Sequence, residues 1–148
     1  MTHKIVLVDD DRNIVTSVRI LLESEGFSVS CYHDGEDGLE GILNDRPDLC
    51  ILDVKMPRMD GMELITKLRD VSSVPVIFLT SKDDEVDQVL GLRLGADDYI
   101  TKPFSQRLLI DRIRSVLRRY APKSEKPASP QTSDQILVRG KLELNDDR

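Results

Sequence analysis

A run of four apolar residues that ends in a single aspartate most constrains the fold of this chain. Leu49 to Leu52 leads directly into Asp53, and a proline lies near each end of the run, at Pro47 and Pro57. A short apolar run bounded in this way is typical of a strand that is buried on both faces. Such strands form parallel sheets covered by helices, and ligands bind at the carboxyl ends of those strands. We therefore expect Asp53 at the binding edge of a parallel sheet, although an aspartate there can also simply begin a turn.

The rest of the chain repeats this pattern of short apolar runs separated by amphipathic segments. Each run is followed by a segment whose apolar residues recur at helical spacing. This alternation predicts one α/β domain over residues 1–120, with a parallel sheet and right-handed crossovers. The predicted strands are 4–8, 27–32, 49–52, 75–79 and 98–100, and the last two helices are predicted at 85–94 and 105–120.

The composition changes after residue 120. Residues 121–135 contain three prolines among Ser, Lys, Glu and Gln and almost no apolar side chains, which is typical of a flexible linker. Residues 136–148 contain two short strand-like runs around Gly140, and two such strands cannot build a core alone. We therefore expect the chain to stop just inside a second domain.

Charge and composition narrow the classes of function. The chain has 148 residues and a formal net charge of -6. An acidic domain repels phosphate backbones and attracts divalent cations, so these residues are poor candidates for binding nucleic acid by themselves. Cys31 and Cys50 lie in strand-like runs and are expected to be reduced, buried thiols. The sequence shows neither a signal peptide nor an apolar run of membrane-spanning length, so we expect a cytoplasmic protein without membrane contacts.

Polar side chains that can hold a cation and a phosphoryl group follow four of the predicted strands. Asp9 and Asp10 follow the first strand, Asp53 the third, Thr80 the fourth and Lys102 the fifth. Because the carboxyl ends of parallel strands meet at one edge, we expect these side chains to converge. Three carboxylates suit a hard divalent cation, an ammonium and a hydroxyl can hold phosphoryl oxygens, and an aspartate can accept a phosphoryl group. Solvated acids, a surface lysine and a threonine that is satisfied at its strand end remain the alternatives for each residue taken alone.

As a set, these residues resemble the motifs of the receiver domain of two-component response regulators. The resemblance covers residues 4–120 and rests on the Asp9–Asp10 pair, Asp53 ahead of MPRMDG at 56–61, Thr80, and KPF at 102–104. It implies a flavodoxin-like (βα)5 fold, a doubly wound parallel sheet with strand order 2-1-3-4-5. It also implies a regulatory protein that promotes its own phosphorylation and dephosphorylation and is not a classical enzyme.

The resemblance implies a role for each acidic residue. Asp53 would accept a phosphoryl group from a sensor histidine kinase. Mg²⁺, for which Mn²⁺ can substitute, would be bound by Asp10, Asp53 and the backbone carbonyl of Lys55, with Asp9 helping through water.

The remaining residues of the site would respond to the phosphoryl group. Lys102 would pair with its oxygens, and Thr80 would hydrogen-bond one of them. Tyr99 would then swing inward from the surface behind Thr80. These movements would repack the surface formed by the fourth helix, the fifth strand and the fifth helix.

The stretch 95–104 narrows the resemblance to the OmpR/PhoB class of transcription factors. Within that class the chain resembles the ChvI-type regulators of alphaproteobacteria. Members bind DNA through a C-terminal winged helix, and residues 136–148 resemble its opening strands. The resemblance therefore implies that DNA is a partner only through a domain that is largely absent from this chain.

The class also implies a homodimer when the protein is phosphorylated, formed through the fourth helix, fifth strand and fifth helix. Gln88 and Leu108 depart from the class, which places a charge pair at these positions. We therefore expect a modest dimer. The charge pairs expected at this interface are Asp98 with Arg112 and Asp97 with Arg119.

Two other functions remain open on the sequence. One is a small Mg²⁺-dependent phosphatase or nucleotide-binding enzyme of similar topology, although no glycine-rich phosphate loop follows the first strand. The other is a stand-alone interaction module that signals by docking, although the linker and the partial strands after it argue against this.

Overall fold

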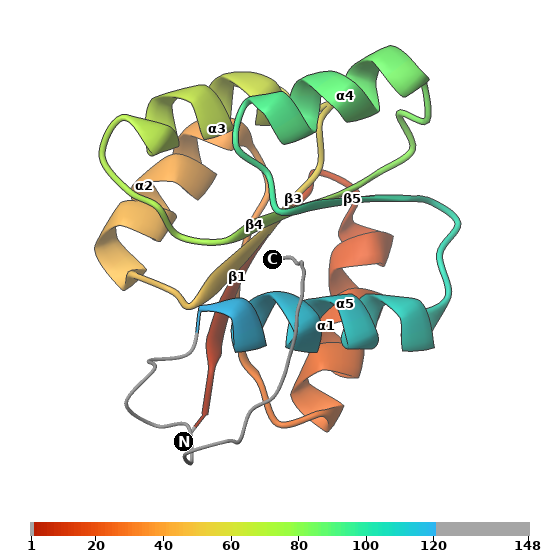
Figure 1. Ribbon diagram of the computed structural model, residues 1–148. Coiled ribbons are helices and arrows are strands. Elements are labelled where there is room, and N and C mark those ends of the chain that lie inside the picture. Colours follow the sequence, from red (N-terminus) through yellow and green to blue (C-terminus); the bar gives the residue numbers. More distant parts are fainter. Residues whose placement is uncertain (1, 121–148) are drawn as a thin grey trace, which may run out of the picture.

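Five strands and five helices alternate along residues 2–120, the part of the chain that the computed structural model describes. The strands form one parallel sheet in the order β2-β1-β3-β4-β5, which confirms the predicted flavodoxin-like fold (Figure 1). The predicted linker at 121–135 and the predicted start of a second domain at 136–148 lie outside the described residues. The elements are β1 (Lys4–Val8), α1 (Arg12–Ser24), β2 (Ser28–Tyr32), α2 (Gly35–Asp45), β3 (Leu49–Leu52), α3 (Gly61–Arg69), β4 (Val76–Thr80), α4 (Glu85–Arg93), β5 (Asp98–Thr101) and α5 (Gln106–Arg119).

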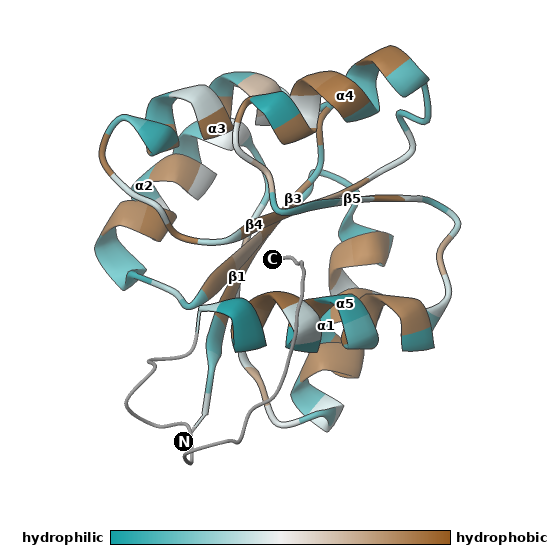
Figure 2. Cartoon of the chain, in the orientation of Figure 1, coloured by the Kyte–Doolittle hydropathy of each residue, from teal (hydrophilic) through white to brown (hydrophobic). Residues whose placement is uncertain are grey.

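Helices cover both faces of the sheet, with α1 and α5 on one face and α2, α3 and α4 on the other (Figure 1). Successive residues of a strand point to opposite faces. In β1, Ile5 and Leu7 pack toward α1 and α5, whereas Val6 and Val8 pack into the opposite layer. The central strands β3 and β4 are apolar throughout except for Thr80 at the end of β4, because both faces are buried (Figure 2).

Four of the five helices between residues 2 and 120 begin where a polar side chain caps them, α4 being the exception. Asp11 is the N-cap of α1, and its carboxylate accepts hydrogen bonds from the backbone N–H groups of Asn13 and Ile14. Ser105 caps α5 in the same way, and its hydroxyl accepts from the N–H of Leu108 at 3.2 Å. These caps fix where the chain turns from each strand end into the next helix.

The predicted strand ends are displaced by one residue at β4 and β5. Thr80 is the last residue of β4, because it pairs in register with Thr101 at the end of β5. The sequence prediction ended β4 at Leu79, since a threonine after an apolar run also suits a turn. Thr80 is fully buried as a result, which places its hydroxyl at the carboxyl edge of the sheet.

The two cysteines, Cys31 and Cys50, lie in strands β2 and β3. Both are free thiols, and Cys50 is buried as predicted, whereas Cys31 is only half-buried. Burial raises the pKa of the Cys50 thiol well above its ordinary value, so this residue stays protonated.

Between residues 2 and 120, no helix has the length and apolar character that crossing a membrane requires.

Candidate functional site

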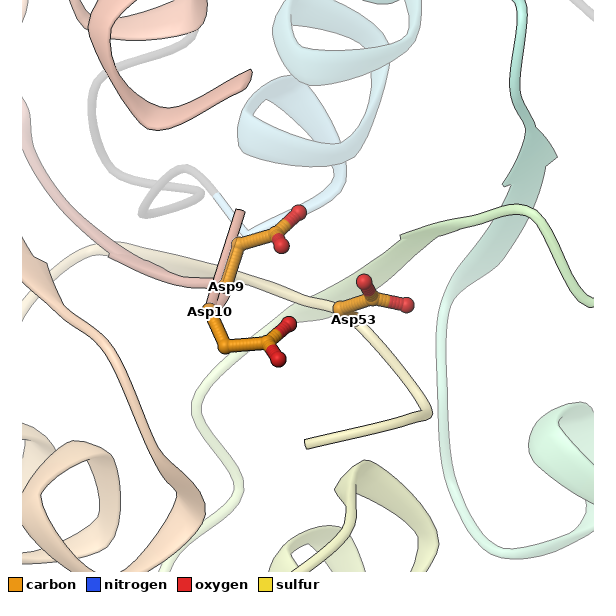
Figure 3. A group of neighbouring side chains, drawn as sticks. All are labelled: Asp9, Asp10 and Asp53. Atoms are coloured by element: carbon orange, nitrogen blue, oxygen red, sulfur yellow. The ribbon is translucent and has the colours of Figure 1, made fainter. Parts of the chain in front are cut away.

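Three carboxylates meet at the carboxyl edge of the sheet (Figure 3). Asp9 and Asp10 directly follow β1, and Asp53 directly follows the neighbouring strand β3. One oxygen from each carboxylate lies within 4.8 Å of the others. Asp9 and Asp53 are buried, whereas Asp10 is exposed, so the cluster is open to solvent on one side.

The ammonium of Lys102 contacts two of these acids from the loop after β5. Its Nζ donates to Asp9 Oδ2 at 2.8 Å and lies 3.3 Å from Asp53 Oδ2. The second oxygens of the two carboxylates are also held, because Asp9 Oδ1 accepts from the N–H of Asp11 and Asp53 Oδ1 accepts from the N–H of Val54. Lys102 and the loop backbone therefore fix the orientation of both buried carboxylates.

Burial and charge shift the pKa values of Asp9 and Lys102. Burial raises the pKa of the Asp9 carboxyl, and the hydrogen bond from Lys102 offsets this only in part. Burial also acts to lower the pKa of Lys102, but the hydrogen bond to Asp9 and the charge of Asp53 outweigh it and raise that pKa. Lys102 therefore stays cationic at neutral pH, whereas the charge on Asp9 is costly to the folded protein.

The donor set fits a hard divalent cation. Carboxylate and carbonyl oxygens are the ligands that Mg²⁺ prefers, and Mg²⁺ usually keeps several waters. Asp10, Asp53 and Lys55 line one open cavity together with Met56 and Ser81. The exposed Asp10 gives a hydrated ion a route into the cluster.

Thr80 and Tyr99 contact the backbone of the same residue, Lys82. The hydroxyl oxygen of Thr80 accepts from the Lys82 N–H at 3.2 Å. The hydroxyl of Tyr99 donates to the Lys82 carbonyl at 2.7 Å. The loop between β4 and α4 thus joins the two predicted switch residues, a link that no sequence signal indicated because it runs through main-chain atoms.

Tyr99 already lies inward, which differs from the predicted position at the surface. Its side chain is buried, and its ring centroid lies 5.6 Å from that of Phe78. Space for the ring comes from Gly91 in α4, where an added Cβ would lie 3.1 Å from the Tyr99 ring and 3.2 Å from Phe78. The inward ring is stable because its hydroxyl also finds an acceptor in Lys82.

Replacing Tyr99 with phenylalanine should reduce the loss of stability at alkaline pH. Burial and nearby carboxylates raise the pKa of Tyr99 to about 12, whereas an unfolded tyrosine ionises near pH 10. The contribution of neutral Tyr99 is therefore full below pH 10 and is lost as the pH rises toward 12. Urea unfolding at pH 9 and pH 11 should show a smaller drop for Tyr99→Phe than for the wild type. Equal drops would show that Tyr99 ionises normally in the folded protein.

Of the two predicted interface pairs, Asp98 with Arg112 forms within the chain, whereas Asp97 binds groups other than Arg119. Arg112 Nη1 donates to both oxygens of Asp98, at 2.8 and 2.7 Å. The side chain of Asp97 is 12% exposed and binds intrachain groups, whereas Arg119 is exposed at the end of α5. The sequence could not distinguish intrachain from interchain pairs, because both use the same residues.

The surface formed by α4, β5 and α5 also carries apolar side chains. Figure 2 shows hydrophobic residues along α4, and the helix buries only Gly91, so most of these apolar residues are exposed. Gln88 donates from Nε2 to the carbonyl of Asp83 at 3.1 Å and so stays on its own helix end. The exposed apolar residues of α4 and the start of α5 are Val86, Val89, Leu90, Leu92 and Leu108.

Residues 5–114 match the family described as response regulator receiver domain. The BeF3-activated N-terminal receiver domain of Klebsiella pneumoniae RstA is 36% identical and has a TM-score of 0.76, over 78% of this chain and 98% of its own. The receiver domain of the Francisella response regulator 1452 is 33% identical with a TM-score of 0.78, over 81% of this chain and 100% of its own. A CheY-like receiver domain protein from Methanospirillum hungatei is 33% identical with a TM-score of 0.76, over 80% of this chain and 96% of its own. With this match over most of its length, the chain belongs to the family of response regulator receiver domains, the regulatory modules of two-component systems.

Proposed function

We propose that this chain is a phosphorylation-controlled response regulator in which Asp53 accepts a phosphoryl group from a sensor histidine kinase. The observation that carries the proposal is the group of Asp9, Asp10 and Asp53 at one sheet edge, with Lys102 in contact with two of them. Phosphoryl transfer depends mainly on positioning and on neutralising charge, and this arrangement supplies both.

Asp10, Asp53 and the backbone carbonyl of Lys55 would hold Mg²⁺ or Mn²⁺. Asp9 would help through water, since its two oxygens already accept from Lys102 and from the loop backbone. When bound, the cation neutralises charge on the phosphoryl oxygens. Asp10 is the exposed member of the cluster, and so it is the ligand that a cation arriving from solvent would meet first.

The transfer step needs a fixed carboxylate and a leaving group. An oxygen of Asp53 attacks phosphorus, the phosphorus–nitrogen bond of the kinase phosphohistidine breaks, and the released imidazole takes up a proton. The N–H of Val54 holds Asp53 Oδ1 at 2.7 Å, which fixes the carboxylate for this attack. Lys102, now 3.3 Å from Asp53 Oδ2, is placed to pair with the phosphoryl oxygens.

The signal would leave the site through Thr80, Lys82 and Tyr99. A phosphoryl oxygen is a strong acceptor, so the Thr80 hydroxyl would turn to donate to it and release the Lys82 N–H. The loop after β4 carries the acceptor of Tyr99 as well, so a shift of this loop changes the position of the ring. The surface of α4, β5 and α5 would change with it.

This surface would pair two copies of the chain about a two-fold axis, as in the OmpR/PhoB class and its ChvI-type members. Exposed ion pairs contribute only about 0–1 kcal/mol each. The apolar residues exposed on α4 would therefore supply much of the contact, and Gln88 and Leu108 supply no charge pair. Transcription would be regulated through a winged-helix domain that begins within residues 136–148, after a linker at 121–135.

The test of this function is phosphorylation by a small donor. Acetyl phosphate with Mg²⁺ or Mn²⁺ should add the mass of one phosphoryl group to the wild type, because the donor needs only the acidic cluster and Lys102. Asp53→Asn should add none, and a chelator should abolish labelling of the wild type. Intact-protein mass spectrometry measures both effects.

An exposed aspartate away from the cluster provides the control. Asp70 is the C-cap of α3 and is exposed, so Asp70→Asn should label like the wild type. Equal labelling of Asp53→Asn and the wild type would remove Asp53 as the acceptor. Labelling that survives the chelator would remove the divalent cation from the mechanism.

A further inference from the structure

Asp97, the residue before β5, lies in a network that joins three parts of its own chain. Its Oδ2 accepts from the N–H of Val76 at 2.9 Å and lies 3.8 Å from Arg69 Nη2. Arg69 in turn donates to the carbonyls of Val74 at 2.7 Å and Gly95 at 2.8 Å. This network fixes Asp97 Oδ2 against the start of β4 and the end of α3.

Tyr120 occupies the other oxygen of the same carboxylate. Its hydroxyl donates to Asp97 Oδ1 at 2.7 Å. Tyr120 is the C-cap of α5, so this bond ties the end of α5 to the turn that precedes β5. Burial and the hydrogen bond to Asp97 raise the pKa of Tyr120, so the phenol remains a donor at neutral pH.

We propose that the Tyr120 hydroxyl is a latch that holds Asp97 within its own chain and limits pairing of Asp97 with Arg119 of a second copy. The proposal rests on the dimer of the proposed function. The backbone N–H of Val76 and Arg69 hold Oδ2 of Asp97, so an arginine of a second copy would bind through Oδ1, which already accepts from the Tyr120 hydroxyl.

The position of Arg119 makes the competition direct. Arg119 is exposed and directly precedes Tyr120, so the guanidinium group and the Tyr120 hydroxyl both belong to the C-terminal end of α5. In a two-fold dimer, the Tyr120 of one chain and the Arg119 of the other would compete for Asp97 Oδ1. Dimerisation would then release the end of α5 just where residues 121–135 continue the chain.

The test compares the dimer affinity of three proteins by analytical ultracentrifugation with Mg²⁺ and beryllofluoride. Tyr120→Phe should lower the dimer dissociation constant about three- to tenfold, because each of the two symmetry-related Asp97 side chains gains a free oxygen. Tyr32→Phe is the matched control, since Tyr32 donates to Asp45 at 2.9 Å in a similar bond outside α4, β5 and α5. Its dimer should equal that of the wild type.

A double variant identifies the partner group. In Tyr120→Phe with Arg119→Ala, the gain in affinity should vanish if Asp97 is released toward the arginine of the second copy. A gain that persists, or a Tyr120→Phe protein that dimerises no more strongly than the wild type, overturns the latch. Either result leaves the proposed function standing if acetyl phosphate still labels Asp53, whereas loss of that labelling overturns the proposed function by itself.

Discussion

Replacing Lys102 with methionine should lower the free energy of unfolding by about 2–3 kcal/mol at neutral pH without added cations. Lys102 contacts two acids whose side chains are nearly inaccessible, Asp9 at 2% and Asp53 at 9% exposed. Removal of the ammonium leaves these charges buried without a cationic partner, and burial already raises the pKa of Asp9. Urea unfolding followed by circular dichroism measures the change.

Two further variants separate this effect from the loss of an ordinary surface charge. Lys67→Met removes an ammonium that lies 3.6 Å from Glu63 in an exposed i, i+4 pair, so it should cost about 0.5 kcal/mol or less. The double variant Lys102→Met with Asp9→Asn should recover part of the lost stability, because it also removes the negative charge of one buried carboxylate. Equal losses for Lys102→Met and Lys67→Met would show that the cluster does not depend on its buried cation.

Gly61→Ala should slow phosphorylation of Asp53 by about tenfold or more, because small misplacements of a reacting group are costly. A Cβ at Gly61 would overlap the carbonyl oxygen of Asp53 and lie 2.9 Å from the ring of Phe78. The N–H of Gly61 also donates to the Val54 carbonyl at 2.7 Å, so the start of α3 packs directly on the backbone of the acceptor. The rate of labelling by acetyl phosphate measures the effect.

A second glycine controls for overpacking alone. A Cβ at Gly38 in α2 would lie 2.7 and 2.8 Å from the side-chain methyls of Val8, and its three nearest neighbours would all be side-chain atoms of Val8. Gly38→Ala should therefore lower stability by about 1–3 kcal/mol while the folded protein labels at nearly the wild-type rate. Similar labelling rates for the two variants would show that contact of Gly61 with Asp53 does not position the acceptor.

The sequence predicted the sheet and the grouping of the acids because both follow from local patterns. Short apolar runs specify strands buried on both faces, and a polar residue just after such a run must lie at the sheet edge. Asp9, Asp10, Asp53 and Lys102 meet there for that reason. The match to the receiver family favours a regulatory domain over the phosphatase or nucleotide-binding enzyme that the sequence left open.

The contacts that the sequence missed depend on packing between distant segments. The inward position of Tyr99 depends on the absence of a side chain at Gly91 and on a main-chain acceptor at Lys82. The burial of Asp97 depends on a backbone donor in β4 and on Tyr120 at the far end of α5. Neither acceptor nor donor has a sequence signature, since every residue except proline offers the same backbone groups.

The most direct measurement of the central proposal locates the phosphoryl group. Protein labelled by acetyl phosphate in Mg²⁺ is reduced with borohydride, which converts an acyl phosphate to an alcohol, and the modified peptide is sequenced by mass spectrometry. We expect one modified residue, at position 53, because Asp53 is the carboxylate held between Lys102 and the Val54 N–H. Modification at Asp9 or Asp10, or at an aspartate outside the cluster, would contradict the assignment of Asp53 as the acceptor.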